Sequence, residues 1–196
     1  IKTMADTLPD DPWKQYFQTP AWMQALIAKG ALGQKAGAGI FRKLGKDIQV
    51  LELAAPEYRT GDGAVVHEVK GMLEIREAGE KFAELRASAH PQAQFLWAIF
   101  RDLFHYSAYH LAAIADNARA VDLAIRWGFG WQMGPFETWQ AAGWRDVAAW
   151  VAEDIAAGKA LANVPLPAWV GGDKVTAARG AHTAQGAYSP ARDAFV

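Results

Sequence analysis

Histidine is the residue type in this sequence that most readily serves as a metal ligand or as a general base near neutral pH. The chain contains five of them. Two, His105 and His110, lie in one predicted helix but are five residues apart, whereas two ligands on one helical face need a spacing of four. The others, His67, His90 and His182, lie in predicted connecting or tail segments. The spacing therefore predicts no metal site.

A catalytic base is the other role open to His105, because Asp102 and Tyr109 share its helical face and a carboxylate can orient an imidazole. The alternative is an exposed histidine with an ordinary hydrogen bond, and we favour it. Asn117 precedes a helix start and Asn163 precedes a proline-rich loop, which is typical of capping and turn residues. No catalytic residue is predicted.

Nine tryptophans, including Trp97, Trp127, Trp131 and Trp139, could form an aromatic cage around a ligand. At helical spacing, however, aromatic side chains more often build a core or a helix-packing interface. We expect them to be structural.

A glycine-rich turn at Gly128, Gly130 and Gly134 is followed by Pro135. Glycine permits positive φ and close approach of neighbouring helices, and proline is suited to the first position of a helix. The spacing superficially resembles a dinucleotide fingerprint, but that fingerprint follows a strand and this turn follows a predicted helix. No phosphate or cofactor site is predicted here.

The composition limits the function classes further. The chain has 196 residues, a formal net charge of -1, 52% hydrophobic and 21% charged residues, and no cysteine. It is large enough to bury a core, and it lacks the basic field expected for binding nucleic acid or anionic membranes. No signal peptide or membrane span is visible, and the absence of cysteine is compatible with the cytoplasm. The opening residues 1–12 resemble a joint between elements, so we expect a piece of a longer protein.

Local signals predict a mostly helical chain. A short helix over 20–30 has Thr19 as its N-cap and Gly30 at its end, and a β-hairpin follows at 40–43 and 48–53. Residues 54–68 read as a connector. A helix over 71–88 would turn Leu73, Ile75, Phe82 and Leu85 inward.

The longest predicted helix covers 95–115, and Leu96, Ile99, Leu103 and His110 form its inward stripe. Asp116 or Asn117 caps a helix that ends at Trp127 before Gly128. Two further helices cover 135–143 and 146–157. Residues 171–196 are predicted to be a loop-like tail.

An internal repeat links the two ends of the chain. Residues 20–22, Pro-Ala-Trp, recur at 167–169, and the same shift of 147 carries Gly39 to Gly186 and Phe41 to Tyr188. We therefore expect the C-terminal part of one module to occur at both ends of the chain.

Two motifs resemble the C-terminal helical domain of 3-hydroxyacyl-CoA dehydrogenases. Residues 121–137 resemble its signature, in which an Asp-containing helix leads through a Gly-x-Gly turn to a Gly-Pro-Phe helix start; residues 33–41 resemble its closing run. The matching positions are Gly33, Lys35, Gly37, Gly39, Asp122, Gly128, Gly130, Gly134, Pro135, Phe136 and Gly143. Their role is interpreted as structural, and Phe136 is expected to be buried.

The order of these motifs is the reverse of their order within one module. The resemblance therefore implies two tandem modules like the C-terminal domain of 6-phosphogluconate dehydrogenase, mainly α, with the first truncated and a small β-hairpin between them. We expect the first module and hairpin to end at 53, a connector with a helix over 54–92, the second module over 93–170 and a linker over 171–196. Truncation would leave Trp13, Phe17 and Trp22 in an exposed apolar patch.

The resemblance also implies a function for the parent protein, namely oxidation of 3-hydroxyacyl-CoA to 3-oxoacyl-CoA by NAD in fatty acid β-oxidation. Its NAD-binding domain and catalytic His-Glu pair are not in this chain, and the family's active-site asparagine falls on Trp97 or Phe100. The chain would form a wall of the acyl-CoA cleft, pack against its NAD-binding domain and an enoyl-CoA hydratase domain, and support a cytoplasmic homodimer. The alternative is a scaffold with no ligand of its own.

Overall fold

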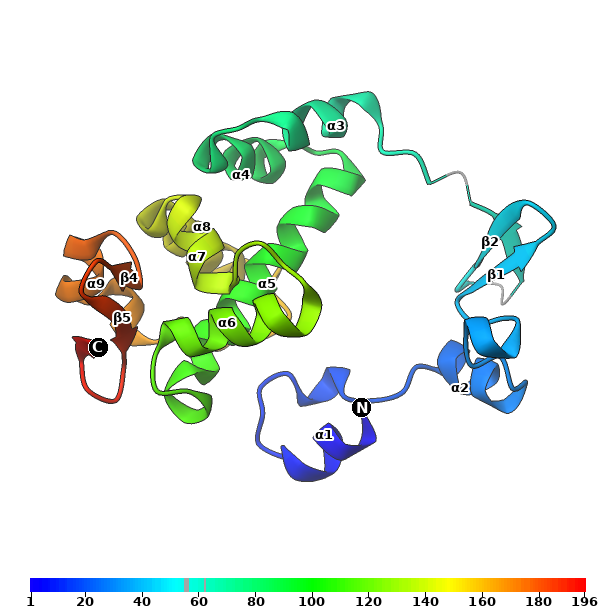
Figure 1. Cartoon of the computed structure of the whole chain (residues 1–196), viewed down its shortest axis with the longest axis horizontal. Coiled ribbons are helices and arrows are strands. Elements are labelled where there is room, and N and C mark those ends of the chain that lie inside the picture. The colour runs from blue at the N-terminus through cyan, green and yellow to red at the C-terminus, as the bar shows by residue number, and fades with distance from the viewer. Residues whose placement is uncertain (55–56, 62) are drawn as a thin grey trace. The chain divides into compact units, whose positions relative to one another are not determined.

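The computed structural model describes residues 1–54, 57–61 and 63–196, which form two compact units, 1–64 and 65–196 (Figure 1). Both are described separately below. The predicted mainly helical fold is confirmed, with two small antiparallel sheets among the described residues. None of the helices in the described part of the chain is both long and apolar enough to cross a membrane.

Unit 1, residues 1–64, contains short helices and one sheet. Its elements are α1 (Lys2–Thr7), η1 (Lys14–Tyr16), α2 (Ala21–Ala28), η2 (Gln34–Ala36), β1 (Phe41–Leu44), β2 (Asp47–Leu51) and β3 (Tyr58–Thr60). The hairpin is confirmed, with Phe41 opposite Val50. A third strand, β3, pairs with β2 inside the predicted connector, so that part of the connector was wrongly interpreted.

Two further expectations for unit 1 need correction. Pro20, and not Thr19, is the N-cap of α2, and its fixed φ of -59° sets the helix entry without a side-chain hydrogen bond. The predicted exposed patch is also wrong in part, because Trp13 and Phe17 are only 4% and 8% exposed. Trp22 is half-buried.

Unit 2, residues 65–196, contains the larger core. Its elements are α3 (His67–Glu74), α4 (Ala78–Ala87), α5 (Pro91–Ile114), α6 (Ala118–Phe129), α7 (Pro135–Ala141), α8 (Trp144–Ala156), η3 (Ala168–Gly171), α9 (Asp173–Ala178), β4 (His182–Thr183), β5 (Gly186–Ser189) and β6 (Ala194–Phe195). Figure 1 shows the long α5 running through this unit, with α4 and α6 near its two ends. Its core is largely aromatic and includes Trp97, Phe104, Phe136, Trp139 and Trp144.

The inward face of α5 differs from the predicted one. Trp97, Arg101, Phe104, Ala108 and Leu111 are buried, a spacing of three and four residues that defines one helical face. The predicted stripe lies beside this face, and its member Ile99 is exposed. Aromatic and aliphatic residues occupy most faces of α5 itself. Hydrophobicity alone therefore does not identify which face of the helix is buried.

The predicted helix over 71–88 is two helices. It breaks after α3, and the carboxylate of Glu77 accepts a hydrogen bond from the amide of Glu80 to cap α4. Phe82 and Leu85 are buried as predicted, whereas Leu73 is exposed. Val69 of α3 packs with Leu85 and Ala93 instead.

The predicted loop-like tail is folded. η3, α9 and the sheet β4-β5-β6 occupy most of it, and Val175, Ala187 and Tyr188 are buried. Burial raises the pKa of Tyr188 to about 12, with Asp193 adding to the effect. The strands are two to four residues long and contain small residues, so they carry little periodic signal in the sequence.

Candidate functional site

A buried polar arrangement of unit 2 lies where α6 meets the start of α7. Asp122 of α6 is buried, and its two carboxylate oxygens accept hydrogen bonds from the backbone amides of Phe136 at 2.8 Å and Glu137 at 3.2 Å. Both amides belong to the first turn of α7, where they have no partner within the helix. Asp122 therefore caps α7 from a different helix.

Gly134 precedes α7 at a position that usually carries a capping side chain. A Cβ at Gly134 would lie 2.3 Å from Cα of Asp122, so only glycine allows this approach. Glu137 accepts a hydrogen bond from the Gly134 amide at 2.8 Å and forms an ion pair with Arg126 at 3.0 Å. Pro135 occupies the first helical position, where the missing N–H has no cost.

His182 closes the arrangement from the C-terminal segment. Its Nε2 lies 2.6 Å from Oδ2 of Asp122, and since a carboxylate is an acceptor, the ring nitrogen donates. The side-chain amide of Gln140 in α7 bonds both the N–H and the C=O of His182, at 2.9 and 3.1 Å. A Cβ at Gly180 would lie 2.1 Å from Oε1 of Gln140, so a second glycine makes room for this contact.

A row of aromatic rings runs beneath this closure. Trp139 stacks on Trp144 with ring centroids 4.3 Å apart, Trp144 lies 6.0 Å from Trp169, and Trp169 stacks on Tyr188 at 5.3 Å. Both fully buried indoles have partners, because Trp139 donates to the carbonyl of Trp144 and Trp144 to that of Val170. These tryptophans form core, as predicted, and not a cage. In contrast, Trp127 and Trp131 are exposed.

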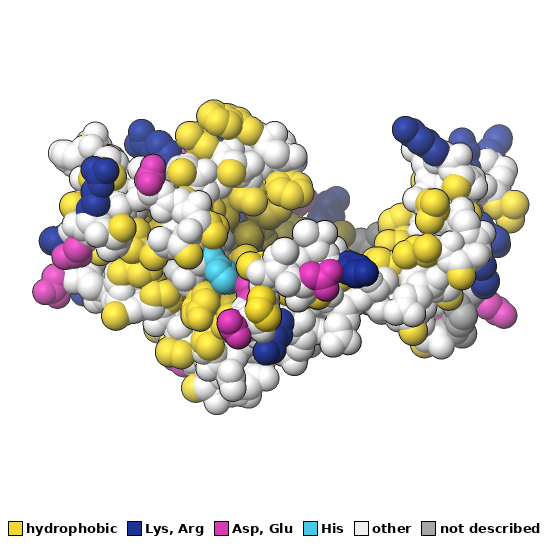
Figure 2. Space-filling model, turned by 90° about the horizontal axis from the view of Figure 1, so that it is seen from below, with side chains coloured by type: hydrophobic (Ala, Val, Ile, Leu, Met, Phe, Trp, Pro, Cys, Tyr) yellow, Lys and Arg dark blue, Asp and Glu magenta, His cyan; other side chains and the backbone are white. Residues whose placement is uncertain are grey.

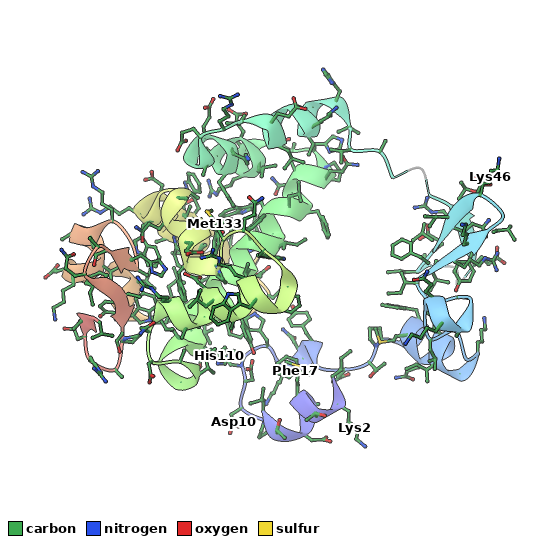
Figure 3. All side chains as sticks on the ribbon, viewed as in Figure 1. Lys2, Asp10, Phe17, Lys46, His110 and Met133 are labelled. Carbon is green, nitrogen blue, oxygen red and sulfur yellow. The ribbon has the colours of Figure 1, made fainter. Side chains whose placement is uncertain are left out.

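The helix before the glycine-rich turn was predicted to end at Trp127, before Gly128, and this end is wrong by two residues. Gly128 is helical, α6 ends at Phe129, and Gly130 has the positive φ of 69° that terminates it. The loop that follows contains Met133 (Figure 3) and leads into α7. Gly143 has a φ of 95° and separates α7 from α8.

The glycine turn does not suit a dinucleotide. A phosphate at a helix N-terminus needs unpaired amides, and those of Phe136 and Glu137 already bond Asp122. The buried carboxylate would also repel a phosphate. The turn leaves α6, a helix, and not a strand. The residues present here therefore do not fit NAD.

The prediction that His105 is exposed is wrong, because it is fully buried. Burial lowers its pKa, an effect partly offset by a backbone hydrogen bond with Val164 and by the charge of Asp102. The carboxylate of Asp102 bonds Arg101 at 2.7 Å and the amide of Leu161 at 2.9 Å. This carboxylate is held in a structural network.

Of the two positions where the family's active-site asparagine was expected, Trp97 is buried in the core and Phe100 is partly buried against it. Trp97 is buried and donates to Asp154 of α8 at 2.7 Å, which also pairs with Arg101 at 3.4 Å. Phe100 packs edge-on against Phe82 of α4, with centroids 5.0 Å apart. Neither position presents a polar group to a substrate.

Local contacts are made by His90, Asn117 and His110. His90 caps α5 by accepting from the amide of Gln92, and Asn117 caps α6 through the amide of Ala120, as predicted. His110 contacts the rings of Tyr106 and Tyr109. Across the ranges described above, no three His, Cys, Asp or Glu side chains are grouped to hold a metal ion.

The motif residues of unit 1 form a tight loop. The backbone amide of Gly33 donates a hydrogen bond to the carbonyl of Ala38 at 2.7 Å. A Cβ at Gly39 would lie 2.8 Å from Cα of Gly33. Gly37 has a φ of 80°. Lys35 is exposed on this loop. The motif at 33–41 and the motif at 121–137 lie in different units.

The fold and this site define a helical module in which a buried aspartate caps a Gly-Pro helix and a C-terminal segment closes over the cap. The chain is 34% identical over 134 residues to a Bacillus subtilis (strain 168) protein with the name "Probable 3-hydroxyacyl-CoA dehydrogenase", covering 68% of the chain and 17% of that protein. It is 24% identical over 165 residues to a Rickettsia felis protein whose name describes a fatty acid oxidation complex trifunctional enzyme, covering 81% of the chain and 20% of that protein.

By this similarity the chain belongs to the 3-hydroxyacyl-CoA dehydrogenase family. It spans about a fifth of the length of these relatives. No family model matches the chain. No solved structure matches it either.

Proposed function

We propose that this chain is a helical part of an NAD-dependent 3-hydroxyacyl-CoA dehydrogenase that acts in fatty acid β-oxidation. The observation that carries the proposal is the Asp122-capped Gly-Pro-Phe helix, in a chain 34% identical to a protein with that dehydrogenase name. In the reaction, a base removes the hydroxyl proton of the substrate while hydride passes from carbon to NAD, giving a 3-oxoacyl-CoA. Both steps would take place on a domain other than this one.

The proposed module boundaries follow the two motifs. Residues 1–53 would be the end of a first helical module, 54–92 a connector that also carries strand β3 of its sheet, and 93–170 a second module. Residues 171–196 would be a folded end of that module and a link to the next domain. An NAD-binding domain, an enoyl-CoA hydratase domain and a second subunit are the proposed partners, in the cytoplasm. The name of the Rickettsia felis relative, which describes three functions in one protein, favours such a multidomain parent.

Within the parent, unit 2 would act as packing and cleft wall without taking part in proton transfer. At the two positions where the family's asparagine was expected, Trp97 is buried in the core and Phe100 packs against the core. This observation favours the second candidate function, a scaffold module with no ligand of its own.

The parent activity is tested by expressing the complete reading frame and following NADH formation with 3-hydroxybutyryl-CoA. We expect turnover; a folded full-length protein without it would sink the dehydrogenase proposal. The two roles for the chain itself are separated by thermal unfolding with acetoacetyl-CoA, because a ligand that binds only the folded state raises the midpoint. No shift favours the scaffold, and a concentration-dependent rise favours the cleft wall.

A further inference from the structure

Two pairs of positions in the sequence repeat also have similar backbone angles, although the helix after the first pair differs, being α2 in unit 1 and η3 in unit 2. Pro20 has φ -59° and ψ 151°, and Pro167, 147 residues later, has φ -58° and ψ 143°. Gly33 and Gly180, separated by the same shift, have φ of 130° and 155°. Gly33 is followed by η2 and then by β1, and Gly180 is followed by the two-residue β4 and then by β5. We call residues 20–41 and 167–188, which the shift of 147 relates, the two closing segments.

The copy in unit 2 shows what a closing segment does. His182 bonds the carboxylate of Asp122, and Gln140 fills the space beside Gly180 and holds the backbone of His182. Two apolar side chains of the segment complete the contact, because Ala187 and Tyr188 are 0% and 3% exposed. The segment thus contributes a contact between a histidine and a carboxylate, a backbone held by Gln140, and a buried apolar strand.

The closing segment in unit 1 has a polar side chain, a glycine with open space beside it, and two apolar side chains at the corresponding positions. None of the three has the contacts that its counterpart has in unit 2. Lys35 stands in the place of His182, is exposed, and forms no ion pair among the residues the structure describes. The space beside Gly33, where Gln140 would lie, holds no atom within 4 Å of a built Cβ. Ile40 and Phe41, in the places of Ala187 and Tyr188, are 42% and 62% exposed.

We propose that residues 20–41 are the closing segment of another helical module, with the same architecture as residues 91–156, and that Lys35 pairs with the carboxylate capping its Gly-Pro helix. Within unit 2, the corresponding places at Asp122 and Gln140 are filled by His182. A lysine is the complementary charge for such a carboxylate, and Ile40 and Phe41 supply larger apolar surface than Ala187 and Tyr188 do.

Under the proposed function, the partner module would lie in a longer polypeptide of which this chain is a part, as the chain spans about a fifth of its relatives. The inference rests on the proposed two-module organisation and adds the contact that joins the segment to its module.

Lysine acetylation tests this contact directly. The chain of 196 residues and the protein expressed from the complete reading frame are treated with acetic anhydride, and modification of each lysine is followed by mass spectrometry. Lys46, at the end of the β1–β2 hairpin (Figure 3), is the matched control because it is exposed in the same unit. We expect Lys35 and Lys46 to react at similar rates in the chain, and Lys35 to react about tenfold more slowly in the full-length protein, as for an amine in a desolvated ion pair. Equal rates for Lys35 in both proteins would overturn the proposal.

A second measurement tests the chemistry of the pair within the chain. If a lysine in this segment can pair with the capping carboxylate, His182→Lys should lower the thermal unfolding midpoint less than His182→Met does. Methionine is a neutral side chain similar in length to lysine. His182→Lys that is no better than His182→Met would contradict the assigned pair. Neither experiment uses substrate, so protection of Lys35 in a protein without dehydrogenase activity would leave this inference standing and defeat only the proposed function.

Discussion

At the scale of single residues, Asp122 determines how the family motif folds. Its carboxylate replaces the capping side chain that Gly134 lacks, and it also binds a histidine 60 residues further along the chain. The sequence showed the aspartate, the glycine and the proline as one motif. It gave no local signal for His182, because the bond joins segments that are distant in sequence. The shift of 147 pairs His182 with Lys35 and so marks position 182 in the repeat, but it does not identify Asp122 as the partner of His182.

Substitution of Asp122 tests this role. Asp122→Ala removes an acceptor from two backbone amides and from His182, so we expect it to lower the free energy of unfolding by about 3 kcal/mol or more. Urea titration followed by tryptophan fluorescence measures the loss. Asp116→Ala, at an exposed aspartate nearby, should change stability by no more than about 0.5 kcal/mol. Similar effects of the two substitutions would refute the capping role.

Phe136 is buried as the sequence predicts, and it packs edge-on against Trp169 with centroids 6.0 Å apart. Phe136→Ala should cost about 3 to 5 kcal/mol, because it removes buried surface and leaves a cavity. Phe129→Ala is the matched control, since Phe129 is 73% exposed at the end of α6, and should shift stability by no more than about 0.5 kcal/mol. A silent Phe136→Ala would show that this residue is not part of the core.

His105 gives unit 2 a specific pH dependence. Its folded-state pKa lies below the usual 6.5 because burial disfavours the charged ring. Between the folded pKa and 6.5 the unfolded chain binds a proton that the folded chain does not, so stability is fully present above 6.5 and falls as the pH is lowered through this window. His105→Leu should flatten the thermal midpoint between about pH 7 and pH 5 relative to the original chain. Identical slopes for the two proteins would contradict a lowered pKa.

At the scale of elements, the sequence predicted helix starts best where residues with a strong preference for the first positions of a helix are present. Asn117 and Pro135 mark helix starts that the structure confirms. The inward face of α5 was wrong because most of its faces are apolar, and the short strands after Gly180 were missed because tertiary contacts, and not periodicity, stabilise them. The buried faces of α5 and β5 are fixed by partners distant in sequence.

Two glycines of the same motif should respond to alanine with opposite signs. Gly128 lies inside α6, and no atom lies within 4 Å of a Cβ built there, so Gly128→Ala should stabilise the chain by about 0.5 to 1 kcal/mol. Gly134→Ala would place its Cβ 2.3 Å from Asp122 and should destabilise it by about 1 to 3 kcal/mol or more. Thermal unfolding of both variants measures the difference, and destabilisation by Gly128→Ala would show that residue 128 is part of the turn.

At the scale of the whole molecule, the two units differ in how much apolar surface they bury. Among the described residues of unit 1, the buried hydrophobic side chains are Trp13, Phe17, Leu26 and Leu51, whereas unit 2 contains the aromatic core. Figure 2 shows hydrophobic side chains at the surface, with Lys and Arg side chains among them. Ile27, Leu32, Phe41 and Ile48 are exposed in unit 1. Such surface is typical of a segment whose partner lies elsewhere.

This difference predicts the order in which the units open. A region with few buried apolar contacts opens locally at low cost, and proteases cleave the opened backbone first. Limited trypsin treatment of the chain should therefore cut after Lys35, Lys43 or Lys46, which are exposed, and leave a product that retains residues 65–196. Mass spectrometry and N-terminal sequencing identify that product. Early cleavage within α5 to α8 would contradict the prediction. If the closing segment docks in the full-length protein, the backbone after Lys35 becomes buried, and trypsin should then cut there more slowly than in the chain.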